Sequence, residues 1–74
     1  MPEEETRIAR EVLSSVLPYI AYPQELREML EKGLRAGGDR DAFMESLKRS
    51  IDEENDVAKK TDLRIFLAEF RRHV

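Results

Sequence analysis

Hydrophobic residues recur at intervals of three and four in four segments of the chain, with polar residues between them. At about 100° per residue, this spacing places the hydrophobic side chains on one face of a helix. The pattern therefore predicts an all-α fold with helices over about 3–17, 23–36, 39–54 and 57–73.

Prolines and glycines mark the breaks between the first three segments. Pro18 lacks an amide hydrogen and disfavours helical dihedrals at the residue before it, so the first helix should be broken or end there. Pro23 suits the first position of a new helix, whereas Gly37-Gly38 followed by Asp39 provides a left-handed helix end and a new N-cap. Connections this short favour antiparallel neighbours, so we predict a compact four-helix bundle.

The start of the last helix is less sharply marked, because both Asp56 and Thr61 can act as N-caps. We favour the early start at Asp56, with an irregularity at Thr61. Ile65 lies about 160° from the centre of the inward stripe that this helix presents. Either the helix is buried on two sides, or Ile65 belongs to a second interface.

The length of 74 residues is near the lower limit for a chain that folds alone, so we expect one helical domain spanning 1–74. Cysteine is absent, which excludes disulfides and thiolate chemistry. Homodimer formation or unusually good packing is expected to supply the missing stability. Abundant Arg, Glu and Lys, with only two side-chain amides, are compatible with a thermostable protein.

The net charge of −3 gives no general attraction to phosphate, which argues against nucleic acid as the partner. The first residues are acidic, unlike the basic start of a targeting peptide. No apolar run approaches the roughly 20 residues needed to cross a bilayer. We therefore expect a cytoplasmic protein with no membrane contact.

Catalytic and metal-binding patterns are not found in the sequence. His73 is the only histidine, which excludes two-histidine metal sites within one chain and leaves this residue as the base of any Ser-His-Asp arrangement. Calcium is disfavoured at residues 52–56, because an EF-hand loop starting at Asp52 would need glycine and glutamate where Val57 and Leu63 stand. A short bundle also has little room for a cleft. We expect no enzyme activity, no cofactor and no metal.

The acidic residues 52–56 lie at the end of the third helix, where carboxylates oppose the helix dipole. Local pairing with Lys59 and Lys60 would offset this charge. Docking of a basic partner surface, with Glu53 and Glu54 setting its orientation, is the alternative.

Two tyrosines and an isoleucine lie in the first connection, where polar residues are more usual: Tyr19, Ile20 and Tyr22. Tyrosine is enriched at binding hot spots. These side chains either fold over the end of the bundle or form a contact surface together with Ile65.

The charge is polarised along the chain, with 14 acidic and 8 basic residues in 1–56 but 2 acidic and 5 basic residues in 57–74. Lys60, Arg64 and Arg71 fall within about 40° on the last helix. They either compensate the negative charge of the acidic helices in the same bundle or form a phosphate-binding stripe.

The leading hypothesis is therefore a non-enzymatic protein-protein interaction module, a small regulator or adaptor. We also expect it to form a homodimer. Its expected contact residues are Tyr19, Ile20, Tyr22, Glu53, Glu54 and Ile65. The alternative is a nucleic-acid-associated regulator that uses Lys60, Arg64 and Arg71.

Overall fold

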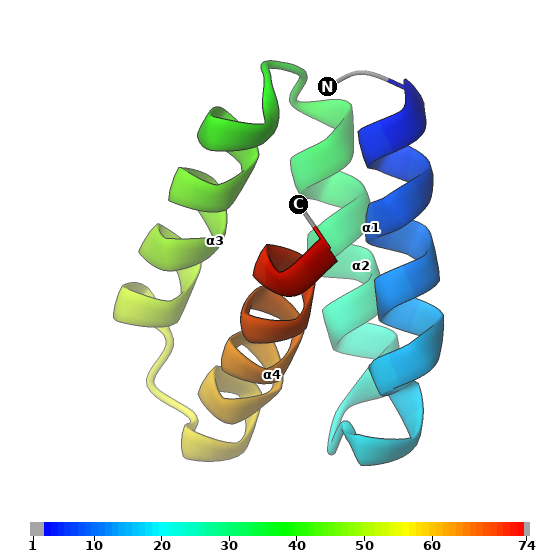
Figure 1. The fold of residues 1–74 in the computed structure, drawn as a ribbon. Helices are drawn as coiled ribbons and strands as arrows, with labels where there is room; N and C mark the ends of the chain where they lie inside the picture. The colour runs from blue at the N-terminus through cyan, green and yellow to red at the C-terminus, as the bar shows by residue number, and fades with distance from the viewer. Residues whose placement is uncertain (1–2, 74) are drawn as a thin grey trace.

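A computed structural model describes residues 3–73, which form four α-helices and one short 3-10 helix (Figure 1). The elements in chain order are α1 (Glu3–Val16), η1 (Leu17–Tyr19), α2 (Pro23–Arg35), α3 (Arg40–Glu53) and α4 (Val57–His73). The predicted helix ends agree with these bounds to within one residue, and the predicted all-α four-helix bundle is confirmed.

Consecutive helices run in opposite directions, so the connections lie at two ends of the bundle (Figure 1). The connection through η1 and the connection between α3 and α4 share the lower end in this view. The turn between α2 and α3 lies at the other end. Helix α4 packs most extensively against α1 and then against α3, which makes it the central helix of the core.

The breaks have the causes that the sequence indicates. Pro18 lies in η1, where α1 has ended, and Pro23 occupies the first position of α2. Gly37 and Gly38 have φ angles of +81° and +87°, which side chains with a Cβ rarely adopt. The carboxylate of Asp39 then accepts a hydrogen bond from the amide of Ala42 at 2.9 Å and caps α3.

Helix α4 begins at the earlier of its two candidate caps. The Asp56 carboxylate accepts from the Lys59 amide at 3.1 Å, and its carbonyl accepts from the Lys60 amide at 2.9 Å. The Thr61 hydroxyl instead donates to the Val57 carbonyl at 2.8 Å, inside the helix. Asp56 therefore caps α4, and Thr61 bonds back to the preceding turn. Helix α4 continues through Thr61 without a break, so the irregularity expected there is not found.

Three phenylalanines form an aromatic cluster at the centre of the core: Phe43, Phe66 and Phe70. The Phe43 ring meets the Phe66 and Phe70 rings edge-on, with centroids 6.5 and 5.6 Å apart. Such edge-to-face contacts add about 0.5–1.5 kcal/mol each to the burial of the rings. Gly33 permits this packing, because a Cβ at its position would lie 3.1 Å from Cε1 of Phe43.

Within residues 3–73, no helix is both long and apolar enough to span a membrane.

Candidate functional site

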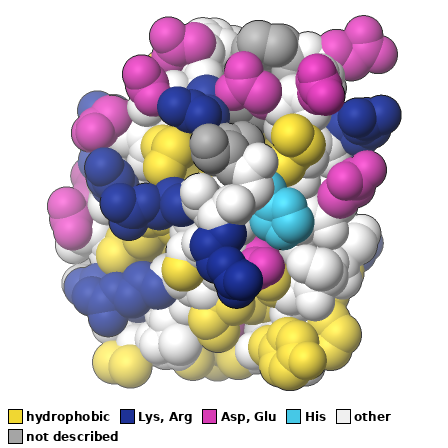
Figure 2. Space-filling view, viewed as in Figure 1, with side chains coloured by type: hydrophobic (Ala, Val, Ile, Leu, Met, Phe, Trp, Pro, Cys, Tyr) yellow, Lys and Arg dark blue, Asp and Glu magenta, His cyan; other side chains and the backbone are white. Residues whose placement is uncertain are grey.

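The large hydrophobic side chains that the structure exposes within residues 3–73 gather at one end of the bundle. Tyr19 is 75% exposed, Tyr22 is 40% exposed and Val57 is 78% exposed. Tyr19 ends η1, Tyr22 precedes α2 and Val57 begins α4, so all three belong to the end where these elements meet. Figure 2 shows hydrophobic side chains along this lower edge of the molecule. We call Tyr19, Tyr22 and Val57 the apolar end.

Ile20 does not join this surface, which corrects the prediction that it is a contact residue. Its side chain is only 9% exposed and belongs to the hydrophobic core. The backbone of Ile20 is extended, with φ −98° and ψ 133°. Successive side chains of an extended segment point to opposite sides, so Ile20 lies inward while its neighbours Tyr19 and Ala21 are exposed.

Ile65 also lies apart from the apolar end. Its side chain is half-buried and packs against the core. Because α4 packs against both α1 and α3, apolar residues are needed on more than one of its sides. Burial on two sides, the first alternative from the sequence, therefore explains Ile65, and the structure places no separate exposed patch there.

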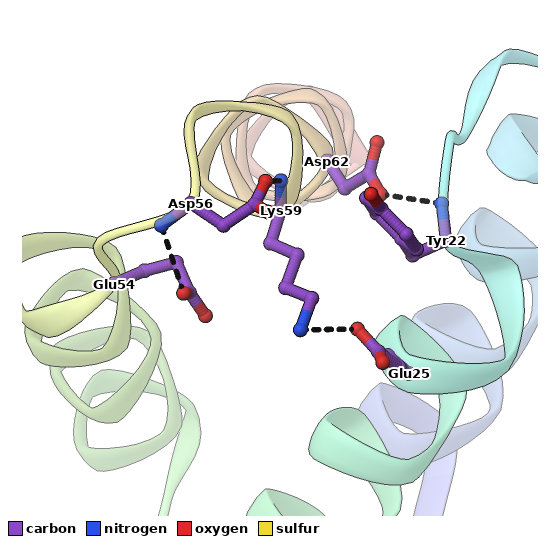
Figure 3. Close-up of polar contacts among 6 residues, drawn as sticks. All are labelled: Tyr22, Glu25, Glu54, Asp56, Lys59 and Asp62. Carbon is purple, nitrogen blue, oxygen red and sulfur yellow. Dashed lines mark hydrogen bonds and ion pairs between the residues drawn. The ribbon is translucent and has the colours of Figure 1, made fainter.

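Glu53 and Glu54 lie at the same end as the tyrosines, at the junction of α3 and α4. Glu53 is exposed and Glu54 is half-buried. Glu54 Oε2 accepts from the Asp56 amide at 3.1 Å, which is a bond within the connection (Figure 3). The structure thus places four predicted contact residues, Tyr19, Tyr22, Glu53 and Glu54, at the same end of the bundle, whereas Ile20 and Ile65 pack against the core.

Lys59 does not form the expected ion pair with this acidic segment. Its Nζ atom lies 2.9 Å from Glu25 Oε2 on α2 and 5.5 Å from the centroid of the Tyr22 ring. In Figure 3 the side chain extends from α4 into the space between α3 and α2. The hydrogen bond and charge of Glu25 raise the pKa of Lys59 above its ordinary value of 10.5, and the nearby Glu54 carboxylate adds to this. Lys59 therefore stays charged and links the start of α4 to the start of α2.

Asp62 is a buried charged residue that the sequence analysis did not single out. It is 3% exposed, and its two carboxylate oxygens accept hydrogen bonds from the amides of Ala21 at 2.9 Å and Tyr22 at 2.8 Å. Tyr22 is the N-cap of α2 and has no side-chain cap of its own. A carboxylate from α4 therefore accepts the backbone hydrogen bonds at the start of α2.

One signal in the sequence could have indicated this role. Tyr22 stands at a cap position that usually carries Ser, Thr, Asp or Asn, so the start of α2 needs an acceptor from elsewhere. Asp62 lies one residue before Leu63, on the side of α4 that turns toward the core. An acid in that position is costly to bury unless it has donors to satisfy it.

A groove of about 680 Å³ lies between α2 and α3, although the sequence suggested that a short bundle has little room for a cleft. Its floor is apolar and consists of Met29 and three buried leucines, Leu26, Leu47 and Leu63. Apart from Tyr22, the remaining lining residues are small or charged: Gly33, Ala36, Ser46, Ser50, Glu25, Glu28, Lys32, Arg49, Glu53, Glu54, Lys59 and Asp62. Tyr22 lies at one end of the groove, which connects the groove with the apolar end.

The basic stripe of Lys60, Arg64 and Arg71 lies on the outer side of α4. Lys60 is half-buried, and the two arginines are exposed. None of the three forms an ion pair with another side chain in the described part of the chain. Figure 2 shows Lys and Arg side chains across the face that α3 and α4 occupy. These three basic residues are therefore not neutralised by direct ion pairs with acidic residues of the same bundle.

The last two candidates for chemistry are the single histidine and a possible metal site. His73 Nε2 lies 3.5 Å from Glu69 Oε1, one helical turn earlier in α4. Among residues 3–73, no three His, Cys, Asp or Glu side chains are arranged to hold a metal ion.

The sequence of this chain matches the MJ1579 family over residues 7–73. The matched region covers α2, α3, α4 and all but the first turn of α1. No curated protein and no solved structure matches the chain.

Proposed function

This chain belongs to the MJ1579 family, and we propose that it is a non-enzymatic protein-interaction module, a small regulator or adaptor that binds a basic partner protein through its apolar end. The composition favours the cytoplasm as the place where this contact forms.

The observation that carries the proposal is that Tyr19, Tyr22 and Val57 are all exposed at the same end of the bundle. Single exposed hydrophobic residues are ordinary on protein surfaces, whereas several large ones at one end of a small domain favour a contact site there. Tyrosine suits such a site, because its large ring loses little conformational entropy and its hydroxyl group can still form hydrogen bonds.

The charge beside the apolar end favours a basic partner. Asp52 and Glu53 are exposed and form no ion pair with the described residues, and Glu54 bonds only to a backbone amide. A basic surface would neutralise these carboxylates and steer the encounter. A two-fold homodimer would instead bring the same acidic patch of both copies into one interface, which makes it the less favoured form.

The test uses two variants of the intact chain, Tyr19→Ser and Glu53→Lys, in quantitative capture of partners from the native host. Truncating an aromatic hot spot costs about 2 kcal/mol, so Tyr19→Ser should weaken the captured complex about thirtyfold. Glu45→Lys is the matched control, because Glu45 is exposed on the same helix but away from the end. Equal capture by the wild type, Tyr19→Ser and Glu53→Lys would refute the proposal.

Homodimerisation is measured separately by light scattering over a concentration series. A dimer that Tyr19→Ser dissociates would show that the apolar end binds a second copy. A chain that stays monomeric up to millimolar concentration would exclude the homodimer and leave the partner-binding proposal in place.

A second candidate function, nucleic-acid binding, is supported by the absence of ion pairs at Lys60, Arg64 and Arg71 within the described residues. Three phosphate contacts predict a slope of about −2.7 in log affinity against log salt for duplex DNA. Arg64→Gln should reduce that slope by about 1. An affinity that ignores salt, or no affinity at low salt, would exclude this candidate.

A further inference from the structure

Helix α2 contributes least to the core among the four described helices. Its buried side chains are Leu26 and Leu30, whereas each of the other three helices contributes three to five buried residues. It packs against α3 and α4 less extensively than α4 packs against α1 or α3, and its packing against α1 is weaker still. Because burial of apolar surface is the main favourable term in folding, α2 is the helix that packing attaches least firmly.

Some leucines of the core need α2 for their burial. Leu47 on α3 and Leu63 on α4 are 3% and 2% exposed, and both lie where α2 meets these two helices. The residues that line the same gap include Gly33, Ser46 and Ser50, which have little apolar surface to bury. Movement of α2 away from the bundle would expose Leu47 and Leu63 to water, but the extensive packing of α4 against α1 and α3 would not need to change.

Two side chains of α4 hold the start of α2 (Figure 3). Asp62 accepts hydrogen bonds from the Ala21 and Tyr22 amides at 2.9 and 2.8 Å. The Nζ atom of Lys59 lies 2.9 Å from Glu25 Oε2 and 5.5 Å from the centroid of the Tyr22 ring. We call Lys59 and Asp62 the latch. Hydrogen bonds to an ionised acceptor are the stronger kind, so Asp62 is its main part.

The other end of α2 is free to turn. Gly37 and Gly38 follow the helix with φ angles of +81° and +87°, and no atom lies within 4 Å of the position that a Cβ of Gly37 would occupy. Glycine changes its backbone dihedrals at little cost. In the second half of α2, Glu31 forms an ion pair with Arg10 of α1, and surface pairs of this kind contribute little.

We propose that α2 is a cover that opens and closes on the native chain, turning at Gly37-Gly38 when the latch releases, while α1, α3 and α4 stay packed together. The closed cover keeps Leu47 and Leu63 from water. The open cover exposes both leucines and removes Tyr22 from the apolar end. Such a local opening needs less free energy than unfolding of the whole chain.

Native-state hydrogen exchange of the full chain, followed by NMR at low guanidinium concentrations, tests whether α2 opens by itself. We expect the protection factor of the Leu30 amide to be at least tenfold lower than that of the Phe66 amide in α4. The opening at Leu30 should also depend less steeply on guanidinium, because it exposes less surface. Equal protection factors, or equal slopes, would show that α2 opens only with the whole chain and would overturn the proposal.

A core variant separates the cover from the rest of the bundle. Val12 is buried on α1, which packs mainly against α4, so its contacts should persist when the cover opens. Val12→Ala removes two buried methyl groups and should lower the protection factor of Phe66 about tenfold. The protection factor of Leu30 should stay unchanged. A fall at Leu30 as large as the fall at Phe66 would contradict the proposal.

A latch variant tests what keeps the cover closed. Asp62→Asn should lower the protection factor of Leu30 about tenfold, whereas Asp52→Asn, an exposed change on α3, should leave it unchanged. The same protection of Leu30 in both variants would exclude Asp62 as the latch. This comparison and the wild-type slopes remain decisive even if circular dichroism shows that Val12→Ala folds poorly.

Discussion

Replacing Asp62 by asparagine tests whether a carboxylate from α4 holds the start of α2 in place. In the native chain, the two oxygens of Asp62 accept from the Ala21 and Tyr22 amides at 2.9 and 2.8 Å. The asparagine side chain would keep one acceptor oxygen and present an NH₂ group to the other amide. One hydrogen bond is then lost, the other no longer has a charged acceptor, and two donors face each other.

The magnitude follows from the burial of each partner. A hydrogen bond to a charged group contributes about 1.5–3 kcal/mol. Both hydrogen bonds are only partly buried, so water can replace part of what is lost, and we expect the lower part of this range, about 1.5–2 kcal/mol. For a domain of this size, that loss lowers the melting temperature by about 6–16 °C.

Thermal unfolding followed by circular dichroism measures the effect, with Asp52→Asn as the matched control. Asp52 is exposed near the end of α3, and its change should stay within about 0.5 kcal/mol. Hydrogen exchange at the Ala21 and Tyr22 amides should also become faster in Asp62→Asn. Equal melting temperatures for the two variants, together with unchanged exchange at these amides, would refute the reasoning.

Three smaller changes test other parts of the structure. Because Glu25 raises the pKa of Lys59, their contact stabilises the fold below pH 10.5 and is lost as the pH rises through the folded-state pKa; the melting difference between wild type and Glu25→Gln should therefore shrink between pH 9 and about pH 12, and a constant difference would contradict this. Gly37→Ala should cost about 1–2 kcal/mol in chemical denaturation from backbone strain alone, since φ is +81° and no atom lies within 4 Å of the new Cβ; an unchanged midpoint would count against it. Gly33→Ala should fail to gain the roughly 1 kcal/mol of helix propensity, because its Cβ would crowd Phe43 in the aromatic cluster; a full gain in the denaturation midpoint would show that this ring can move.

The helices could be predicted because their signals are local. Each break restricts only the backbone of neighbouring residues, so its effect does not depend on where the rest of the chain lies. This holds for Pro18, Pro23 and the pair Gly37-Gly38. The choice of Asp56 over Thr61 followed the same local chemistry of a cap.

The candidate site was predicted only in part, because burial depends on neighbours that are distant in the chain. Tyr19 and Ile20 look equally available in the sequence, but one extended residue turns Ile20 into the core and leaves Tyr19 outside. Lys59 stands close to the acidic segment in sequence, yet its ammonium group contacts Glu25, 34 positions earlier. Asp62 was missed for the same reason, since its donors lie 40 and 41 positions away.

By itself, the sequence determined the number of helices, their bounds and the ends of the bundle at which the connections lie, since hydrophobic periodicity and backbone stereochemistry act over a few residues. Only the tertiary structure decided that α4 is buried on two sides, that its Asp62 holds the start of α2, and that short residues on α2 and α3 leave a groove. These features depend on how four helical surfaces fit together, and packing of that kind is decided by shape and distance across the whole fold.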